Sequence, residues 1–292
     1  MRKPALNILV AASWIAGIGM PAVVAALVIF LLVRSAGTLD MRLIFGDVAW
    51  HAALGGARVL EGLWPAIAGT LMLVVTSSAI AVPLGLAAGI YISEYASQRM
   101  KAPVTLMVDV LAGTPSIIMG LFGFAIILLL RKTLAPNATT GLMIAAVCLA
   151  FLVLPYMVRA TQSALGGLPM AMRLLGPSLG MSHTQSVMRI LVPAASRGIL
   201  SGVVLSLGRA AEDTAVIMLT GAVATAGGRA PQGLMSKFEA LPFSIYVTAA
   251  EHNTVEELNV GFAMALVLLA LTTSLFMGAY LLQRGLEWRW KA

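Results

Sequence analysis

Between two hydrophobic runs of this chain, residues 168–193 read LPMAMRLLGPSLGMSHTQSVMRILVP. The segment is long and carries charges, whereas connections between packed helices are usually short. It contains a glycine, then nine residues, then an isoleucine and shortly a proline, at Gly180, Ile190 and Pro193. We therefore expect a structured loop with a role of its own rather than a simple connection.

The local signals inside this loop predict two short helices. Pro169 is suited to the first turn of a helix, where its missing N–H is not needed. Gly180 is a natural left-handed end, and Ser182 with Gln185 three residues later forms a capping box that opens a second helix. Pro193 is expected to limit that helix. Two short helices around a glycine form a knob that fits a groove on another protein, although these features are equally compatible with a solvated loop on a membrane surface.

The composition outside the loop is that of a membrane protein. Hydrophobic residues make up 60% of the chain, charged residues only 11%, and the mean hydropathy is +0.94, which excludes an ordinary soluble domain. A membrane-spanning helix needs about 20 apolar residues. Runs of this kind occupy residues 8–33, 62–93, 110–130, 133–158, 198–222 and 258–283. The sequence therefore predicts an all-α polytopic membrane protein with six transmembrane helices, the first of them too long for a cleaved signal.

The net charge of +7 comes from basic residues that flank the hydrophobic runs. Their position argues against nucleic-acid binding. With the N-terminus in the cytoplasm, more of the arginines and lysines fall inside than outside, which agrees with the positive-inside rule. We therefore expect a multi-pass protein of the cell inner membrane with both termini in the cytoplasm. This orientation also places the loop at residues 159–197 in the cytoplasm.

The sequence holds no motif for catalysis. It lacks a Walker A pattern, HExxH, GxSxG and any cysteine and histidine cluster, and the three histidines are scattered. We therefore expect no catalytic residue, no cofactor and no metal site. Any ATP hydrolysis must take place in a separate subunit.

Charged residues inside a hydrophobic run are the strongest candidates for a functional site. Arg209, Glu212 and Asp213 lie within the fifth run, where a charge costs roughly 2.5–3.5 kcal/mol on insertion scales. Either acid can share a helix face with the arginine. The planar guanidinium suits bidentate contact with an oxyanion such as phosphate. The alternative is a structural ion pair that locks two helices together.

Two hydroxyl residues flank a proline in the third run. Thr114 and Ser116 lie where a helix is expected to break, and broken helix ends in membranes often mark a substrate path. Their alternative role is hydrogen bonding between helices. We include both residues in the predicted substrate path, together with Arg209, Glu212 and Asp213.

Several strings of the chain resemble those of one transporter family. They are Glu94-Tyr95-Ala96, LAGTPSIIMGLFG at 111–123, LP at 154–155 followed by VRAT at 158–161, GRAAEDTA at 208–215 and LPFSIY at 241–246. From about Trp64 to the C-terminus the chain is similar to PstA-type permeases of phosphate-specific ABC importers. The spacing of Gly180, Ile190 and Pro193 resembles that of the EAA loop, the cytoplasmic segment through which importer permeases of this kind contact their ATPase.

The resemblance implies a domain organisation and a function. Residues 1–63 would be an N-terminal transmembrane helix and an external loop, and residues 64–292 an ABC importer permease-type domain with a coupling loop at 159–197. The protein would be the channel-forming subunit of an ATP-driven phosphate importer. Its partners would be ABC ATPase subunits, a second homologous permease and an extracytoplasmic phosphate-binding protein. The residues expected to couple the permease to the ATPase are Gly180, Ser182, Gln185, Ile190 and Pro193.

The chain also departs from the family pattern. The positions of the Glu-Ala-Ala motif hold Leu174, Leu175 and Gly176, followed by Pro177. We expect the loss of an acidic contact to the ATPase and a first helix that is kinked or shortened. Where the family has Gly-Glu-Thr after the membrane arginine, residues 212–214 read Glu-Asp-Thr.

Three other functions are compatible with these residues. The permease could carry another oxyanion, such as sulfate or molybdate. A proton-coupled secondary carrier would use Asp109, Glu212 and Asp213 and would need no ATPase. An intramembrane hydrolase is the least favoured, because the sequence has no motif that pairs a nucleophile with a base.

Overall fold

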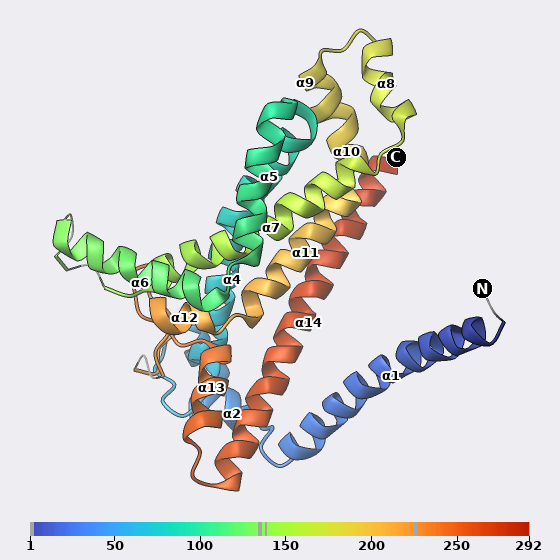
Figure 1. Cartoon of the computed structure of the whole chain (residues 1–292). Helices are drawn as coiled ribbons and strands as arrows, with labels where there is room; N and C mark the ends of the chain where they lie inside the picture. The colour runs from blue at the N-terminus through green and yellow to red at the C-terminus, as the bar shows by residue number, and fades with distance from the viewer. Residues whose placement is uncertain (1–2, 134–135, 138, 225–226, 292) are drawn as a thin grey trace.

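The computed structural model of the chain describes residues 3–133, 136–137, 139–224 and 227–291. Apart from an isolated bridge between Ala222 and Phe238, the regular elements of these residues are helices (Figure 1). In chain order they are α1 (Lys3–Ser35), α2 (Met41–Phe45), α3 (Trp50–Leu54), α4 (Trp64–Ile90), the π-helix η1 (Tyr91–Tyr95), α5 (Gln98–Gly113), α6 (Ser116–Thr133), α7 (Leu142–Gly166), α8 (Met170–Ser178), α9 (His183–Ser186), the π-helix η2 (Val187–Leu191), α10 (Val192–Ala194), α11 (Ser196–Glu212), α12 (Ala215–Thr220), α13 (Leu241–Glu251) and α14 (Val255–Lys291).

Within the described residues, five helical segments are long and apolar enough to cross a membrane. They are Ser13–Ser35, Trp64–Tyr95, Ser116–Thr133, Leu142–Gly166 and Val255–Leu281. A sixth span is formed if His183–Ala194 and Ser196–Glu212 are taken together, although the two are bent by 67°. The predicted all-α, multi-pass membrane architecture is thereby confirmed.

Two of the hydrophobic runs are not continuous helices. In the third run, α5 ends at Gly113 and α6 begins at Ser116, with Thr114 in extended backbone (φ −73°, ψ 123°). The cause is Pro115, which disfavours helical backbone at the residue before it. In the fifth run, α11 ends at Glu212 and Asp213 is extended (φ −74°, ψ 124°) without any proline. Both breaks lie next to residues of the predicted substrate path.

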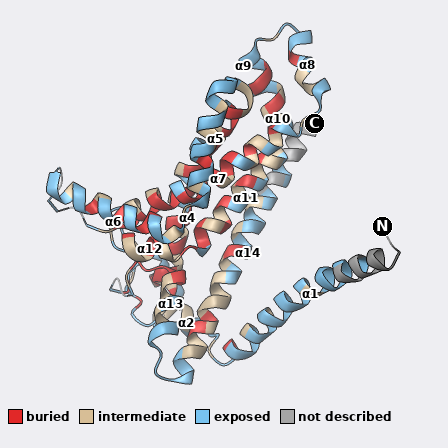
Figure 2. Cartoon of the chain, in the orientation of Figure 1, coloured by how far each residue is buried: buried red, intermediate tan, exposed pale blue. Residues whose placement is uncertain are grey.

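Small residues allow the central helices to pack closely. A Cβ added to Gly85 of α4 would lie 2.7 Å from Cβ of Met157 in α7, and one added to Gly89 would lie 2.5 Å from Cβ of Thr161. Such stripes of small residues, four positions apart, bring helix backbones together in membranes. The core is formed by α4, α7, α11 and α12, where buried residues such as Leu149 concentrate (Figure 2).

The bundle has two distinct ends. The short helices α8, α9 and α10 and the C-terminal end of α14 lie at one end, and α2 and α13 lie at the other (Figure 1). The long helix α1 lies at the side and contacts α14, where the rings of Phe30 and Phe262 pack edge to face with centroids 5.3 Å apart. Most of the exposed side chains that the structure describes in α1 are apolar, with Trp14 67% exposed, as expected for a surface that faces lipid.

Candidate functional site

The loop at residues 168–193 folds into the two short helices that its sequence predicts. The first, α8, begins after Pro169, and Gly180 adopts left-handed backbone at φ +70°. At α9 the Ser182 hydroxyl accepts from the Gln185 backbone N–H at 3.3 Å, and the Gln185 side-chain oxygen accepts from the Ser182 N–H at 3.0 Å. The predicted capping box is therefore present.

Two residues that depart from the family motif, Gly176 and Pro177, affect how α8 packs on α9 and where α8 ends. Gly176 lies against Ser186, so that an added Cβ would be 2.2 Å from the Ser186 Oγ. Glycine at this position lets α8 lie directly on the second short helix. The first helix ends at Ser178, one residue after Pro177, in agreement with the shortening expected from that proline.

The second half of the loop is built into the bundle. Val187 and Leu191 of η2 are buried among Leu165 of α7 and Ile199 of α11. Pro193 lies one residue before the end of α10 at Ala194, and the chain then bends by 67° into α11, so the second helix ends next to Pro193 as expected.

The five predicted coupling residues therefore divide into two groups. Gly180, Ser182 and Gln185 lie exposed at the tip of the loop. Ile190 and Pro193 are half-buried beneath it, and Ile190 packs against the buried cluster of η2. The tip is open to a partner, whereas the lower part connects it to the membrane helices.

A buried ion pair, which the sequence analysis did not predict, joins α8 of this loop to η1 at the end of α4. Nη1 of Arg173 in α8 lies 3.0 Å from both carboxylate oxygens of Glu94 in η1, and Nη2 donates to the Leu165 carbonyl at 2.7 Å. The Glu94 side chain is only 4% exposed. The His183 ring of α9 lies 3.0 Å from the Glu94 carbonyl oxygen and packs edge to face on Tyr95. Both short helices are thus held to the end of α4.

Arg209 occupies the last turn of α11 and pairs with the acid that follows the helix. Its Nη2 lies 3.3 Å from Oδ2 of Asp213, whose side chain is 2% exposed. The other oxygen of Asp213 accepts from the Val216 N–H at 2.9 Å, which caps the first turn of α12. Asp213 therefore has two structural contacts, whereas Glu212 is exposed. About a third of the Arg209 side chain, 32%, remains accessible.

The two broken helices run side by side beyond their breaks. A Cβ on Gly120 of α6 would lie 2.9 Å from the Ala215 carbonyl oxygen of α12, and one on Gly123 would lie 2.6 Å from Cγ2 of Thr220. The two helices therefore run parallel, and α6 begins about one turn before the contact between Gly120 and the first residue of α12. This arrangement brings the start of α6, with Ser116, close to the break that follows Arg209.

The two predicted hydroxyl residues lie at the break before α6. Thr114 and Ser116 are both half-buried at the break between α5 and α6. The Thr114 hydroxyl donates to the Val110 carbonyl of its own helix at 2.8 Å, rather than to a neighbouring helix. The N-terminal end of α6, which begins at Ser116, carries partial positive charge.

Two of the three acids of the carrier alternative are paired with arginines. Asp109 of α5 forms an ion pair with Arg159 of α7, and Asp213 pairs with Arg209. Glu212 is exposed. Among the described residues, no group of three His, Cys, Asp or Glu side chains could hold a metal ion.

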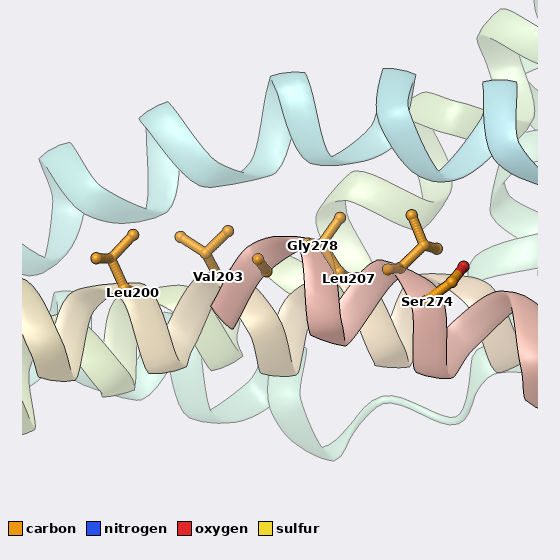
Figure 3. Close-up of a pocket in the computed structure, with 7 residues that line it drawn as sticks. Leu200, Val203, Leu207, Ser274 and Gly278 are labelled. Atoms are coloured by element: carbon orange, nitrogen blue, oxygen red, sulfur yellow. The ribbon is translucent and has the colours of Figure 1, made fainter. Parts of the chain in front are cut away.

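An apolar cleft lies between α11 and α14. Figure 3 shows Leu200, Val203 and Leu207 along one wall and Ser274 with Gly278 along the other, around a cavity of about 330 Å³. The Ser274 hydroxyl donates to the Leu271 carbonyl of its own helix. With no charged side chain in its lining, this cleft suits hydrocarbon rather than a charged solute.

The membrane-spanning bundle belongs to a known class of transport protein. The family described as the binding-protein-dependent transport system inner membrane component matches residues 81–288, and the chain belongs to this family. The predicted membership in the ABC importer permeases is thereby confirmed.

Relatives of known name place the chain more closely. It is 34% identical over 235 residues to the phosphate transport system permease protein PstA 1 of Mycobacterium tuberculosis (strain CDC 1551 / Oshkosh), covering 77% of this chain and 73% of the relative. It is 33% identical over 240 residues to PstA of Mycobacterium leprae, covering 79% and 75%. In fold it is similar to a chain of the inward-facing MetNI methionine ABC transporter, with TM-score 0.58, 17% identity and coverage of 77% and 97%. The predicted resemblance to PstA-type permeases is confirmed.

Proposed function

We propose that this chain is the permease subunit of an ATP-driven importer of inorganic phosphate. The observation that carries the proposal is the likeness to named phosphate permeases over more than two thirds of both chains. In this assignment the protein lies in the cell inner membrane with both termini in the cytoplasm. Residues 1–63 form an accessory helix and external loop, and residues 64–292 form the transport domain.

The path of the anion passes the two helix breaks. Arg209 supplies a guanidinium that is partly accessible, and its planar donors match phosphate oxygens. Thr114 and Ser116 stand at the N-terminal end of α6, whose partial positive charge favours an anion. Asp213 holds the guanidinium in position and keeps α12 capped. Glu212 is exposed beside this group and contributes local negative charge that limits how long an anion stays bound.

The energy for transport comes from a partner ATPase that binds the loop tip. Large apolar side chains are exposed on α8 and directly after it, with Met170 67% exposed and Leu179 72% exposed. Apolar side chains on an exposed cytoplasmic knob fit a groove on another protein. Closure of an ATPase dimer would displace the tip, and the contacts of α8 and α9 with η1 would carry the movement into α4. A second homologous permease and an extracytoplasmic phosphate-binding protein complete the proposed importer.

A disulfide experiment tests the docking of the loop tip. Leu179→Cys should crosslink to a cysteine placed in the groove of the partner ATPase in an assembled complex. Leu179 is a better position than Ser182 or Gln185, because those two side chains form the capping box. The native Cys148 is buried in α7 and gives no background.

The matched control is Leu60→Cys, which is 73% exposed at the opposite end of the bundle. It should not crosslink to the ATPase, and an impermeant thiol reagent should modify it from outside intact cells. If Leu60→Cys crosslinks to the ATPase and Leu179→Cys does not, the orientation of the protein in the membrane is opposite to the proposed one.

A further inference from the structure

A small basic pocket lies at the end of the bundle opposite the loop tip. Its cavity of about 320 Å³ is lined by two segments that are distant in the sequence, Arg58 on one side and residues 227–237 on the other. Arg58 precedes the start of α4, whereas Glu94 at the far end of the same span contacts the loop. A helical span of 32 residues separates these ends by about 48 Å.

Backbone contacts hold the two segments of the pocket together. The Val59 N–H donates to the Gly228 carbonyl oxygen at 2.6 Å. Gly227 and Gly228 adopt left-handed backbone at φ +76° and +68°, and a Cβ on Gly228 would lie 2.8 Å from the Val59 oxygen. Only glycine fits this close approach with this backbone. As a result Arg58 and Arg229, neighbours of the joined residues, line the same cavity.

The charge of the pocket is strongly one-sided. Arg58, Arg229 and Lys237 line it, and all three are exposed. No acidic residue is among its lining, and none of the three cations forms an ion pair with a residue that the structure describes. Unpaired cations around a concave surface concentrate anions and bind oxyanions through charge-assisted hydrogen bonds.

The shape of this surface favours a small anion over a protein partner. The lining between the cations consists of small or compact residues, including Gly227, Ala230, Pro231 and Ser236, around a partly open hollow. The lining that the structure describes contains no aromatic or large apolar side chain of the kind that anchors a protein partner.

We propose that Arg58, Arg229 and Lys237 form an entry site for inorganic phosphate on the extracytoplasmic face of this permease. The inference rests on the proposed function, because it places phosphate at the outer end of a path that leads toward Arg209. The site receives the anion at the surface, before the anion reaches the helix breaks in the membrane.

Protection of a cysteine within the pocket tests this site locally. Ser236→Cys places a thiol in the lining, where the native hydroxyl bonds only the nearby Gly233 carbonyl. In the full-length chain in lipid nanodiscs, inorganic phosphate should slow modification of this thiol by a neutral maleimide. Neutralising one cation, as in Lys237→Gln, should raise the phosphate concentration needed for half-protection by about threefold, as for an exposed ion pair. Neutralising all three should raise it by about thirtyfold if the effects add.

Two controls and four outcomes complete the test. Arg42→Gln, an exposed cation of α2 at the same end but outside the pocket, should leave protection unchanged, and phosphate should not protect Met41→Cys. Equal protection in the parent and the triple variant would overturn the proposal, as would protection by an acidic binding protein but not by phosphate. The assay needs no ATPase. If phosphate does not protect Ser236→Cys in the chain with all three cations, while ATP-driven phosphate uptake is intact, only this site is refuted. Protection without any such uptake would instead refute the proposed function.

Discussion

Arg209→Gln is expected to lower phosphate uptake by about tenfold to a hundredfold, the range expected when a charge-assisted contact to the anion is lost. Uptake would be measured with labelled phosphate at equal amounts of protein in the membrane. Arg209→Lys should keep part of the activity, because it retains the charge but not the planar donors.

A second variant separates transport from folding. Arg209→Gln alone leaves the buried Asp213 carboxylate without its cation, which is itself destabilising. Arg209→Gln combined with Asp213→Asn removes both charges while an amide oxygen can still accept from Val216. This double variant should assemble normally and still fail to transport. Recovery of parental uptake would show that the arginine serves only the ion pair.

The geometry also rules out a simpler experiment. Exchanging Arg209 and Asp213 would be expected to restore a purely structural ion pair. In this chain Asp213 also caps α12, and an arginine at position 213 has no acceptor for the Val216 N–H. The exchanged protein should therefore fail for a local reason that carries no information about transport.

Loss of the buried ion pair between Glu94 and Arg173 is expected to uncouple ATP hydrolysis from transport. Removing one partner of a buried pair typically costs about 3–5 kcal/mol. Glu94→Gln would loosen α8 from η1, so that movement of the loop tip no longer reaches α4. In proteoliposomes that contain the ATPase, the number of phosphate ions moved per ATP hydrolysed should fall at least several-fold, while hydrolysis continues.

The chain offers a matched control in a second ion pair between helices. Arg159 and Asp109 are 45% and 51% exposed, so their interaction is expected to contribute at most about 1 kcal/mol. Asp109→Asn should leave the ratio of phosphate to ATP close to that of the parent. An unchanged ratio in Glu94→Gln, with normal folding, would show that the buried pair does not transmit the movement.

The features that the sequence predicted are those governed by local chemistry. Hydrophobic runs located the spans, and the capping box of Ser182 and Gln185 formed because its partners are three residues apart. Gly180 adopted the left-handed backbone for which glycine is best suited. The resemblance of several sequence strings to PstA-type permeases predicted the family, which composition alone does not define.

The features that the sequence did not reveal depend on contacts between distant segments. Glu94 and Arg173 are 79 positions apart, and no periodicity joins an acid at the end of one span to a base in a later loop. The break after Glu212 has no proline and follows from the tertiary position of Asp213. The basic pocket likewise requires that Val59 and Gly228 meet, which only the folded chain shows.

Phosphate uptake into proteoliposomes is the most direct test of the proposed function. The chain would be reconstituted with its sister permease, the partner ATPase and the phosphate-binding protein, and labelled phosphate would be followed with and without ATP. We expect uptake that requires both ATP and the ATPase, and that excess sulfate or molybdate does not inhibit. Uptake driven by a proton gradient without the ATPase, or ATP-driven uptake of sulfate or molybdate but not of phosphate, would contradict the assignment.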